Sequence, residues 1–274
     1  METIPFKFIH CADLHLDSPF EGIYDYNSDI AESLREATFE SFRNIVDLAI
    51  EENADFIIIS GDVYDGASKN IRTQYRFNQL LERAADSGIQ CFLAHGNHDP
   101  LSTWESSLKL PNNVHRFGCD GVEKSTAKRD NEILAYIYGI SYRQREIKTN
   151  LASQFPQKNN TEPFSIGVLH CNVGGISGYD NYAPCTIDDL VKCGLDYWAL
   201  GHVHNKITLR DNYPCVVYPG NSQGRNIRET GEKGCYLVQV DEDKNIETNF
   251  IPTDTIRWFA KKINISNIDN IQNL

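Results

Sequence analysis

The fold of this chain is decided by the stretch Ile57-Ile58-Ile59-Ser60-Gly61-Asp62-Val63-Tyr64-Asp65. A run of β-branched residues is typical of a strand that is buried on both faces, and the glycine marks an abrupt turn out of it. Two carboxylates follow that turn. They are therefore expected at the carboxyl edge of a sheet, which is where open α/β sheets hold ligands. We predict a ligand site at this edge.

Composition indicates a soluble globular protein. The chain has 274 residues, 41% of them hydrophobic and 23% charged, which suits one large domain. No apolar run approaches the roughly 20 residues that span a bilayer. The first seven residues lack the basic and then apolar pattern of a signal peptide. We therefore expect no membrane partner and a cytoplasmic location.

Charge and cysteine usage narrow the function classes. The formal net charge of −12 argues against general affinity for nucleic acid, but it does not exclude a nuclease with a local basic patch. The eight cysteines include no C-x-x-C pair. Reduced thiols packed as small hydrophobes are expected, rather than disulfides or a structural zinc site.

The first hundred residues alternate strands and helices. Strands are predicted at 6–11, 56–60 and 90–94, and helices at 29–52 and 71–86. This order implies parallel strands joined by right-handed crossovers. Further strands are expected at 133–138, 164–169 and 197–200, and helices at 141–154 and 187–191. Short strands at 207–210, 215–218, 235–240 and 247–251 suggest an antiparallel sheet.

Residues 1–256 are expected to form one domain. A strand is predicted at 257–263, and a helix could begin at Ser266 or Asn267. That helix would have about two turns, too few for stability without packing partners. We expect 257–274 to be the truncated start of a C-terminal capping or partner-binding region. A natural tail packed on the core is the alternative.

Metal-type ligands stand at five predicted strand ends. They are Asp13 and His15, Asp62 and Asp65, Asn97 and His98, His170, and His202 and His204. Each pair alone is weak evidence, but their ordered occurrence at successive strand ends is a strong signal for a shared site.

The blocks Ala12-Asp13-Leu14-His15, Gly61-Asp62-Val63-Tyr64-Asp65, Gly96-Asn97-His98-Asp99, Val168-Leu169-His170-Cys171 and Gly201-His202-Val203-His204 resemble the calcineurin-like metallophosphoesterase superfamily. Within it, residues 10–20 resemble YhaO-type DNA-repair exonucleases, relatives of the SbcD nucleases. Residues 218–222 match a late block of the same proteins.

The resemblance implies an α/β (α+β) fold, a two-sheet β-sandwich of mixed strands flanked by helices. It places Asp13, His15, Asp62 and His204 around one metal, and Asp62, Asn97, His170 and His202 around a second. A carboxylate readily bridges two cations, and this mixture of imidazole and oxygen ligands suits Mn, with Fe, Zn or Mg as alternatives. Two such ions can clamp a phosphoryl group and generate a hydroxide for attack on phosphorus.

His98 and Asp65 are the expected catalytic residues. His98 would protonate the leaving oxygen, and Asp65 would orient or polarise the His98 ring. His95 and Asp99 are interpreted as supports around the ligands, with an ordinary loop role as the alternative. Asp17 is interpreted as a loop-capping carboxylate.

The other candidate residues for nucleic-acid contacts also have simpler structural interpretations. Tyr24, Tyr26, Tyr64 and Tyr142 could stack on bases, but packing is the simpler interpretation. The basic clusters Arg143, Arg145 and Lys148, and Lys124, Lys128 and Arg129, are interpreted as solvated surface. Arg225 and Arg228 are the better candidates for phosphate contacts.

The resulting hypothesis is a Mn-dependent phosphodiesterase that acts on DNA, an exonuclease or endonuclease of DNA repair. An SbcC-like ATPase is the expected partner, and a homodimer stays open. The alternative is a small-molecule phosphodiesterase or phosphatase, which the acidic charge favours. A non-catalytic scaffold is the third reading.

Overall fold

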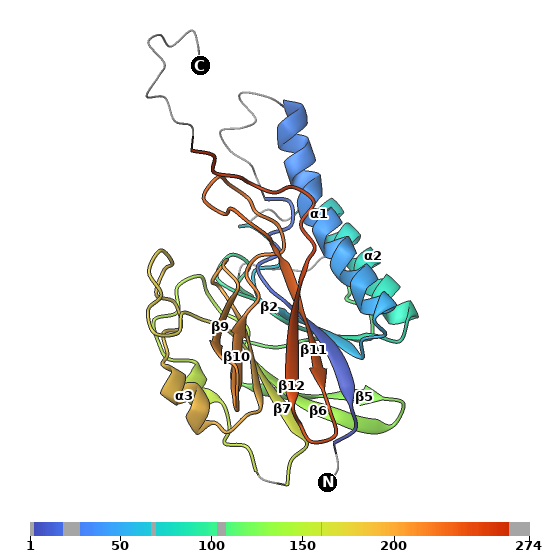
Figure 1. Ribbon diagram of the computed structural model, residues 1–274, viewed down its shortest axis with the longest axis vertical. Coiled ribbons are helices and arrows are strands. Elements are labelled where there is room, and N and C mark those ends of the chain that lie inside the picture. Colours follow the sequence, from blue (N-terminus) through green and yellow to red (C-terminus); the bar gives the residue numbers. More distant parts are fainter. Residues whose placement is uncertain (1–2, 19–27, 67–69, 103–107, 160, 263–274) are drawn as a thin grey trace.

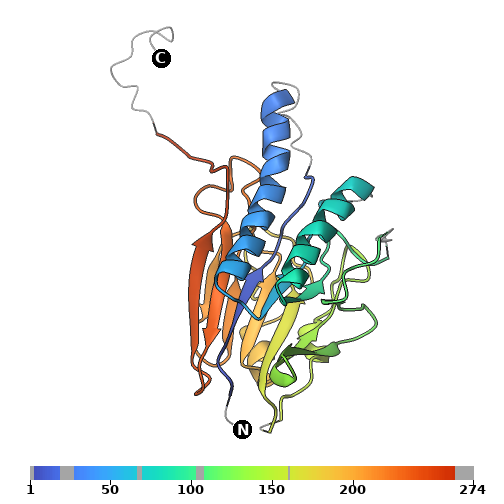
Figure 2. The same ribbon diagram turned by 90° about the vertical axis from the view of Figure 1, so that its right-hand side faces the viewer.

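Two β-sheets packed face to face carry the chain, and two long helices cover the outer face of the first sheet (Figures 1 and 2). The structure is a computed structural model, which describes residues 3–18, 28–66, 70–102, 108–159 and 161–262. In these ranges each sheet has six strands, in the orders β12-β11-β1-β2-β3-β4 and β5-β6-β7-β8-β10-β9. Both mix parallel and antiparallel pairs, so the predicted two-sheet sandwich of mixed strands is confirmed.

The elements of the first sheet are β1 (Phe6–Cys11), β2 (Phe56–Ser60), β3 (Gln90–Ala94), β4 (Val114–Arg116), β11 (Gly234–Val240) and β12 (Ile246–Pro252). Those of the second are β5 (Glu123–Arg129), β6 (Glu132–Gly139), β7 (Phe164–His170), β8 (Tyr197–Gly201), β9 (Ile207–Arg210) and β10 (Cys215–Tyr218). The helices are α1 (Ser28–Glu51), α2 (Ile71–Asp86) and α3 (Ile187–Lys192), with a short 3-10 turn η1 (Ala152–Gln154).

Strand β2 is buried on both faces, as its sequence predicts. Successive side chains of a strand point to opposite faces. Phe56 and Ile58 accordingly enter the core between the sheets, whereas Ile57 and Ile59 enter the core beneath α1 and α2. Because both neighbours of β2 run parallel to it, the carboxyl ends of β1, β2 and β3 meet at one edge.

Helix α2 begins at a polar cap. The side chain of Asn70 accepts a hydrogen bond from the Arg72 backbone N–H, which satisfies one free donor of the first turn. Asp17 accepts from Asn70 at 3.1 Å and from Thr73 at 2.8 Å. Asp17 therefore ties the loop after β1 to this helix, which agrees with its predicted capping role.

The helix predicted at 141–154 is wrong apart from its last turn, where η1 lies. Tyr142 donates its backbone N–H to the carbonyl of His95 and accepts from Leu101, both at 2.9 Å. The backbone groups of this segment are thus used by the loop after β3 and are not available for helical bonds. This extended segment supports the loop that carries Asn97 and His98.

The strand predicted at 257–263 is also wrong in its described part, which ends at Lys262. The backbone N–H groups of Thr255 and Ile256 bond the Gln223 side chain, and the Trp258 indole donates to Gly224 at 3.0 Å. These contacts fasten the segment to the loop after β10 in place of strand pairing. The helix predicted after Ser266 lies outside the described residues.

None of the eight cysteines forms a disulfide, and seven of them are buried, as expected for packed thiols. No helix in the described part of the chain has the length and apolar character needed to cross a membrane.

Candidate metal centre

The five strand ends singled out from the sequence meet at one place. Asp13 and His15 follow β1, Asp62 and Asp65 follow β2, Asn97 and His98 follow β3, His170 ends β7, and His202 and His204 follow β8. The two sheets are joined there by hydrogen bonds, such as that from His170 Nδ1 to the Ser60 carbonyl at 3.0 Å. The sandwich thus brings together all nine side chains that the sequence predicted.

Glycines allow the ligand loops to approach each other closely. A Cβ atom on Gly61 would collide with the His170 ring, and one on Gly96 would collide with the Asp62 carboxylate. Gly61 also has φ +101°, a conformation that side chains rarely adopt. The glycine that opens these blocks is therefore required by the packing of the ligands behind it.

Four ligand-type residues have left-handed backbones without being glycine: Asp13 (φ 51°), His15 (φ 44°), Asp62 (φ 49°) and His202 (φ 101°). Such conformations cost about 1–3 kcal/mol each and persist only where the surroundings enforce them. The loops enforce them here, because the N–H of Asp13 bonds the Gly61 carbonyl and that of His15 bonds the Asp62 carbonyl, both at 3.0 Å.

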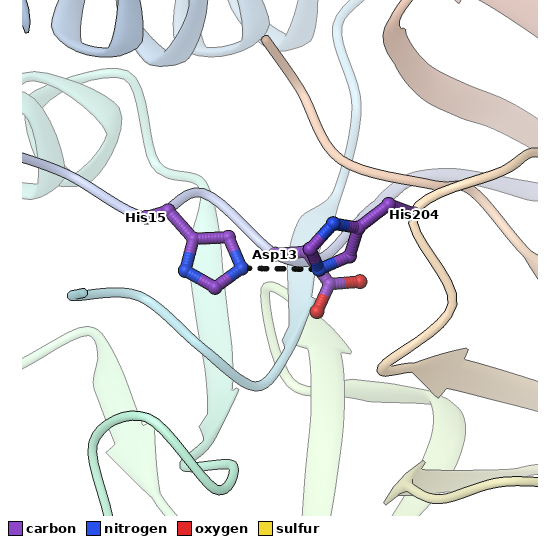
Figure 3. A group of neighbouring side chains, drawn as sticks. All are labelled: Asp13, His15 and His204. Carbon is purple, nitrogen blue, oxygen red and sulfur yellow. Dashed lines mark hydrogen bonds between the residues drawn. The ribbon is translucent and has the colours of Figure 1, made fainter. Parts of the chain in front are cut away.

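One group of donors consists of Asp13, His15 and His204, whose ligand atoms lie within 4.8 Å of one another (Figure 3). The Nε2 atoms of the two histidines face each other at 3.2 Å. Asp62 Oδ2 lies 3.9 Å from His15 Nε2, which places that carboxylate at the border of the group.

A second group shares the Asp62 carboxylate. His170 Nε2 lies 3.4 Å from Asp62 Oδ2 and 3.0 Å from Asn97 Oδ1. His202 Nδ1 lies 3.2 Å from the same Asn97 oxygen. Asp62 thus lies at the border of the first group and within the second, and its ligand atom lies within 4.8 Å of those of Asp13 and His170.

Outer acceptors orient the imidazole rings. The bonds that do so run from His170 Nδ1 to the Ser60 carbonyl (3.0 Å), from His202 Nε2 to the Asp180 carbonyl (2.7 Å) and from His204 Nδ1 to Glu229 Oε1 (2.7 Å). Each ring donates its outer N–H, so the other nitrogen faces the centre and can bind a cation once it has lost any proton it carries. Metal-binding histidines are held in the same way.

Burial shapes the charge of the centre. It raises the pKa of Asp13 to about 6, because the ionised carboxyl loses its hydration. Burial also opposes ionisation of Asp62, but the neighbouring His170 outweighs it and holds the pKa of Asp62 well below its usual range. Burial lowers the pKa of His170, but Asp62 and Asp13 reverse the effect and raise it to about 9. The pKa of His202 is lowered by burial to about 4.

The donor set fits divalent cations. Asp13 and Asp62 are each only 1% exposed, and among the described residues neither makes an ion pair with Lys or Arg. Buried carboxylates of this kind require a compensating positive charge. Imidazole nitrogens with carboxylate and amide oxygens suit Mn, Fe or Zn. Two cations would therefore be held by the two groups, with Asp62 between them.

His98 stands at the rim of the centre. Its Nδ1 contacts Asp65 Oδ1 at 2.8 Å, and its side chain is 29% exposed, whereas those of His15 and His170 are fully buried. Burial lowers the pKa of His98, but the hydrogen bond that its Nδ1–H donates to Asp65 outweighs burial and raises this pKa above the usual value. The pKa of Asp65 is depressed by His98 against the opposing effect of burial. A protonated imidazole at the rim is suited to proton donation.

Asp99 joins the loops after β2 and β3. Its Oδ2 accepts from the Val63 N–H at 2.9 Å and contacts His95 Nδ1 at 3.0 Å, and its Oδ1 accepts from the Gly96 N–H at 2.8 Å. Asp99 and His95 thus support the loops that carry Asp62 and Asn97.

Several other candidates are not among the donors, although the Tyr142 ring packs edge-on against His170 with 5.5 Å between centroids. Tyr64 and Tyr142 are buried, so the packing interpretation is the right one for both, while Tyr24 and Tyr26 lie outside the described residues. Arg228 is exposed, and the one contact described for it is a backbone bond to Asn226.

The two basic clusters are largely paired with acids. The ion pairs are Lys124 with Glu162, Arg129 with Asp55, Arg143 with Asp120 and Lys148 with Glu146. These lysines and arginines are exposed. The interpretation as solvated surface holds for these pairs.

Sequence reasoning missed Glu229. It lies 25 positions after His204, in a loop with no metal-ligand motif, yet it contacts His204 Nδ1. Burial opposes its ionisation, but the hydrogen bond from His204 outweighs it and lowers the pKa of Glu229 to about 2. Arg225, which the sequence suggested as a phosphate contact, donates to Asp65 Oδ2 at 2.8 Å. No spacing rule links either residue to the centre.

Comparison with known proteins agrees with this geometry. Residues 6–206 match the family model of the calcineurin-like phosphoesterases. The chain is 39% identical over 264 residues to the uncharacterized metallophosphoesterase YhaO of Bacillus subtilis, covering 96% of this chain and 64% of that protein. It is 27% identical to the DNA double-strand break repair protein Mre11 of Saccharolobus solfataricus, covering 97% of this chain and 68% of that protein.

Among solved structures, GAP50, the anchor in the inner membrane complex of Plasmodium, superposes with a TM-score of 0.50 at 15% identity, covering 94% of this chain and 90% of that one. This likeness concerns the fold alone. The family model covers most of the chain, and the converged donor groups could hold metal ions. The chain belongs to the calcineurin-like metallophosphoesterase family.

Proposed function

We propose that this chain is a dinuclear metal-dependent phosphodiesterase that acts on DNA, as an exonuclease or endonuclease of DNA repair. The observation that carries the proposal is the Asp62 carboxylate, which is shared by two groups of nitrogen and oxygen donors. Asp13, His15, Asp62 and His204 would hold one cation, and Asp62, Asn97, His170 and His202 the other.

Two divalent cations, with Mn²⁺ proposed, would supply positive charge for the phosphoryl oxygens and would lower the pKa of a water molecule that could attack phosphorus. Side chains of the protein supply and position the proton for the leaving group. His98 donates its proton to the leaving oxygen, and Asp65 holds the His98 ring through Nδ1 at 2.8 Å. The backbone N–H of His98 bonds Asp62 Oδ1 at 2.9 Å, so the proton donor is positioned against the shared carboxylate.

Support for DNA as substrate comes from relatives. The opening block resembles DNA-repair exonucleases, and the Mre11 relative is named for double-strand break repair. The chain spans 64% of the length of YhaO and 68% of the length of this Mre11 protein. An SbcC-like ATPase partner and a homodimer are further parts of the proposal.

The test compares three substrates with the same Mn²⁺-loaded protein. A labelled DNA duplex, a chromogenic phosphodiester and a nucleotide monoester are each incubated with it, and the products are quantified. We expect the duplex to be degraded and the diester to be cleaved, with little release of phosphate from the monoester. Strong monoesterase activity without cleavage of the duplex would refute the nuclease.

The second candidate is a small-molecule phosphodiesterase or phosphatase. The net charge of −12 favours it, because a polyanion such as DNA is repelled by an acidic surface. The same three-substrate comparison decides between the two functions. Turnover of the diester that is insensitive to competing DNA would favour the small-molecule enzyme.

A further inference from the structure

His204 is oriented by a carboxylate that no sequence motif marks. Glu229 Oε1 lies 2.7 Å from His204 Nδ1, and the Glu229 side chain is only 12% exposed. The other ring nitrogen of His204 faces His15 Nε2 at 3.2 Å, inside the first donor group. Glu229 therefore contacts the edge of the His204 ring that points away from the centre.

Glu229 is itself fixed by its loop. Its Oε2 accepts the backbone N–H of Arg225 at 2.7 Å and the side-chain amide of Asn221 at 2.9 Å. Asn221 is fully buried and follows β10 closely. The three groups that contact the carboxylate are the His204 ring, the Arg225 backbone and the Asn221 side-chain amide, and each presents an N–H to it. Both oxygens of Glu229 therefore act as acceptors.

Arg225 connects this carboxylate with the one behind His98. Its Nη1 donates to Asp65 Oδ2 at 2.8 Å, and its Nη2 lies 4.0 Å from Glu229 Oε1. Asp65 in turn holds His98 through its other oxygen at 2.8 Å. The guanidinium offsets the repulsion between two carboxylates that serve different histidines.

We propose that Glu229 is a positioning residue of the metal centre, which fixes the Nδ1–H tautomer of His204 and so directs a bare Nε2 toward the first cation. Arg225 couples Glu229 to Asp65, so one loop after β10 orients both His204 and His98. The inference rests on the proposed dinuclear site and adds a residue to it that does not touch metal or substrate.

The variant E229Q tests the inference because glutamine preserves shape and removes one acceptor. If the amide oxygen faces His204, the amide NH₂ meets the two donors from Arg225 and Asn221. If it is turned round, the NH₂ meets His204 Nδ1 and drives the ring proton to Nε2, toward the cation. Either orientation disturbs the site. The control is E232Q, which changes an exposed glutamate of the same loop that pairs with Lys206 at 3.5 Å.

Full-length wild type, E229Q and E232Q are stripped of metal and titrated with Mn²⁺ by calorimetry, with bound metal counted by elemental analysis. We expect wild type and E232Q to bind two ions, and E229Q to bind one of them 10–100-fold more weakly, the usual effect of losing an outer carboxylate. Equal affinities in E229Q and wild type would overturn the inference while leaving the dinuclear site intact. A wild type that binds no Mn²⁺ would refute the proposed function instead.

A second measurement covers the case in which E229Q does not fold. Nitrogen-15 spectra of the metal-free wild type report which ring nitrogen of His204 carries the proton, with the signal assigned by its loss in His204→Gln. Protonation at Nδ1 is expected. A His204 ring that carries its proton at Nε2 would overturn the inference without any variant of Glu229.

Discussion

Replacing His98 by alanine separates proton donation from metal binding. His98 belongs to a third cluster, in which its ligand atom and those of His15 and Asp62 lie within 4.8 Å of one another, so geometry alone would also allow it to bind a cation. Two observations favour proton donation. The Nδ1 of His98 is already used by Asp65 at 2.8 Å, and the side chain is 29% exposed at the rim where a leaving group would depart.

The expected magnitude follows from that role. General acid catalysis contributes about 10²–10⁴-fold, equivalent to about 2.7–5.5 kcal/mol of transition-state stabilisation. His98→Ala should therefore lower kcat on the preferred diester by that factor. The number of bound Mn²⁺ ions should stay at the wild-type value, because the two proposed ligand sets do not include His98.

The assay pairs steady-state kinetics with metal counting on the same preparation. His115→Ala is the matched control, since His115 is 37% exposed in its side chain and faces Glu123 away from the centre. That control should keep both full turnover and full metal content. If His98→Ala loses a metal ion together with its activity, His98 is a ligand and the assignment of proton donation is wrong.

Three further predictions address the scaffold, the loop after β10 and the metals. Ile58→Ala should lower the free energy of unfolding by about 2–5 kcal/mol, because Ile58 is fully buried between the sheets; a loss below 1 kcal/mol in denaturant titrations would contradict that packing. Arg225→Lys keeps the backbone N–H that bonds Glu229 but removes the guanidinium whose Nη1 donates to Asp65, so kcat should fall while Mn²⁺ affinity is retained, and a parallel loss of affinity in calorimetry would argue against this division. Mn²⁺ at about 100 times the Kd of each site should raise the free energy of unfolding over the chelated protein by about 2.7 kcal/mol for each bound ion, about 5.4 kcal/mol for two, and an unchanged melting temperature after addition of EDTA would contradict a site formed by the native state.

The elements that were predicted correctly from the sequence are those whose own hydrophobic pattern indicates which of their residues are buried. The isoleucines of β2 and the apolar periodicity of α1 and α2 indicated buried strands and surface helices, which the structure has at those positions. Strand β5 was missed for the opposite reason. It reads Glu-Lys-Ser-Thr-Ala-Lys-Arg, only Ala127 of it is buried, and its strand character comes from pairing with β6.

The false helix at 141–154 has a related cause. Helical spacing of apolar residues reports which side chains are buried, but it does not report where the backbone hydrogen bonds go. In this segment they go to His95, Leu101 and Gly118, which are distant in sequence. Backbone partners of this kind depend on tertiary structure and leave no local signal.

The residues of the candidate site also fall into a group that the sequence predicts and a group that it does not. Residues at the ends of buried strands could be assembled from the sequence, since parallel strands present their carboxyl ends at one edge. Glu229 could not, because it reaches His204 only after the chain has passed through β9 and β10 and returned. The residues that orient ligands were thus less predictable than the ligands themselves.

Four residues with a left-handed backbone conformation explain why so many hydrogen bonds join the loops at the carboxyl edge of the sheets. Asp13, His15, Asp62 and His202 together imply about 4–12 kcal/mol of backbone strain, a sum comparable to the stability of a whole domain. Local preference cannot maintain that strain, so the loops must be held from outside. The backbone N–H of His202 bonds both oxygens of Asp13 at 3.1 Å, which joins two of the left-handed residues and links the second sheet to the first. Bound cations would offset part of this free energy, because they bind the native state, in which the donors converge.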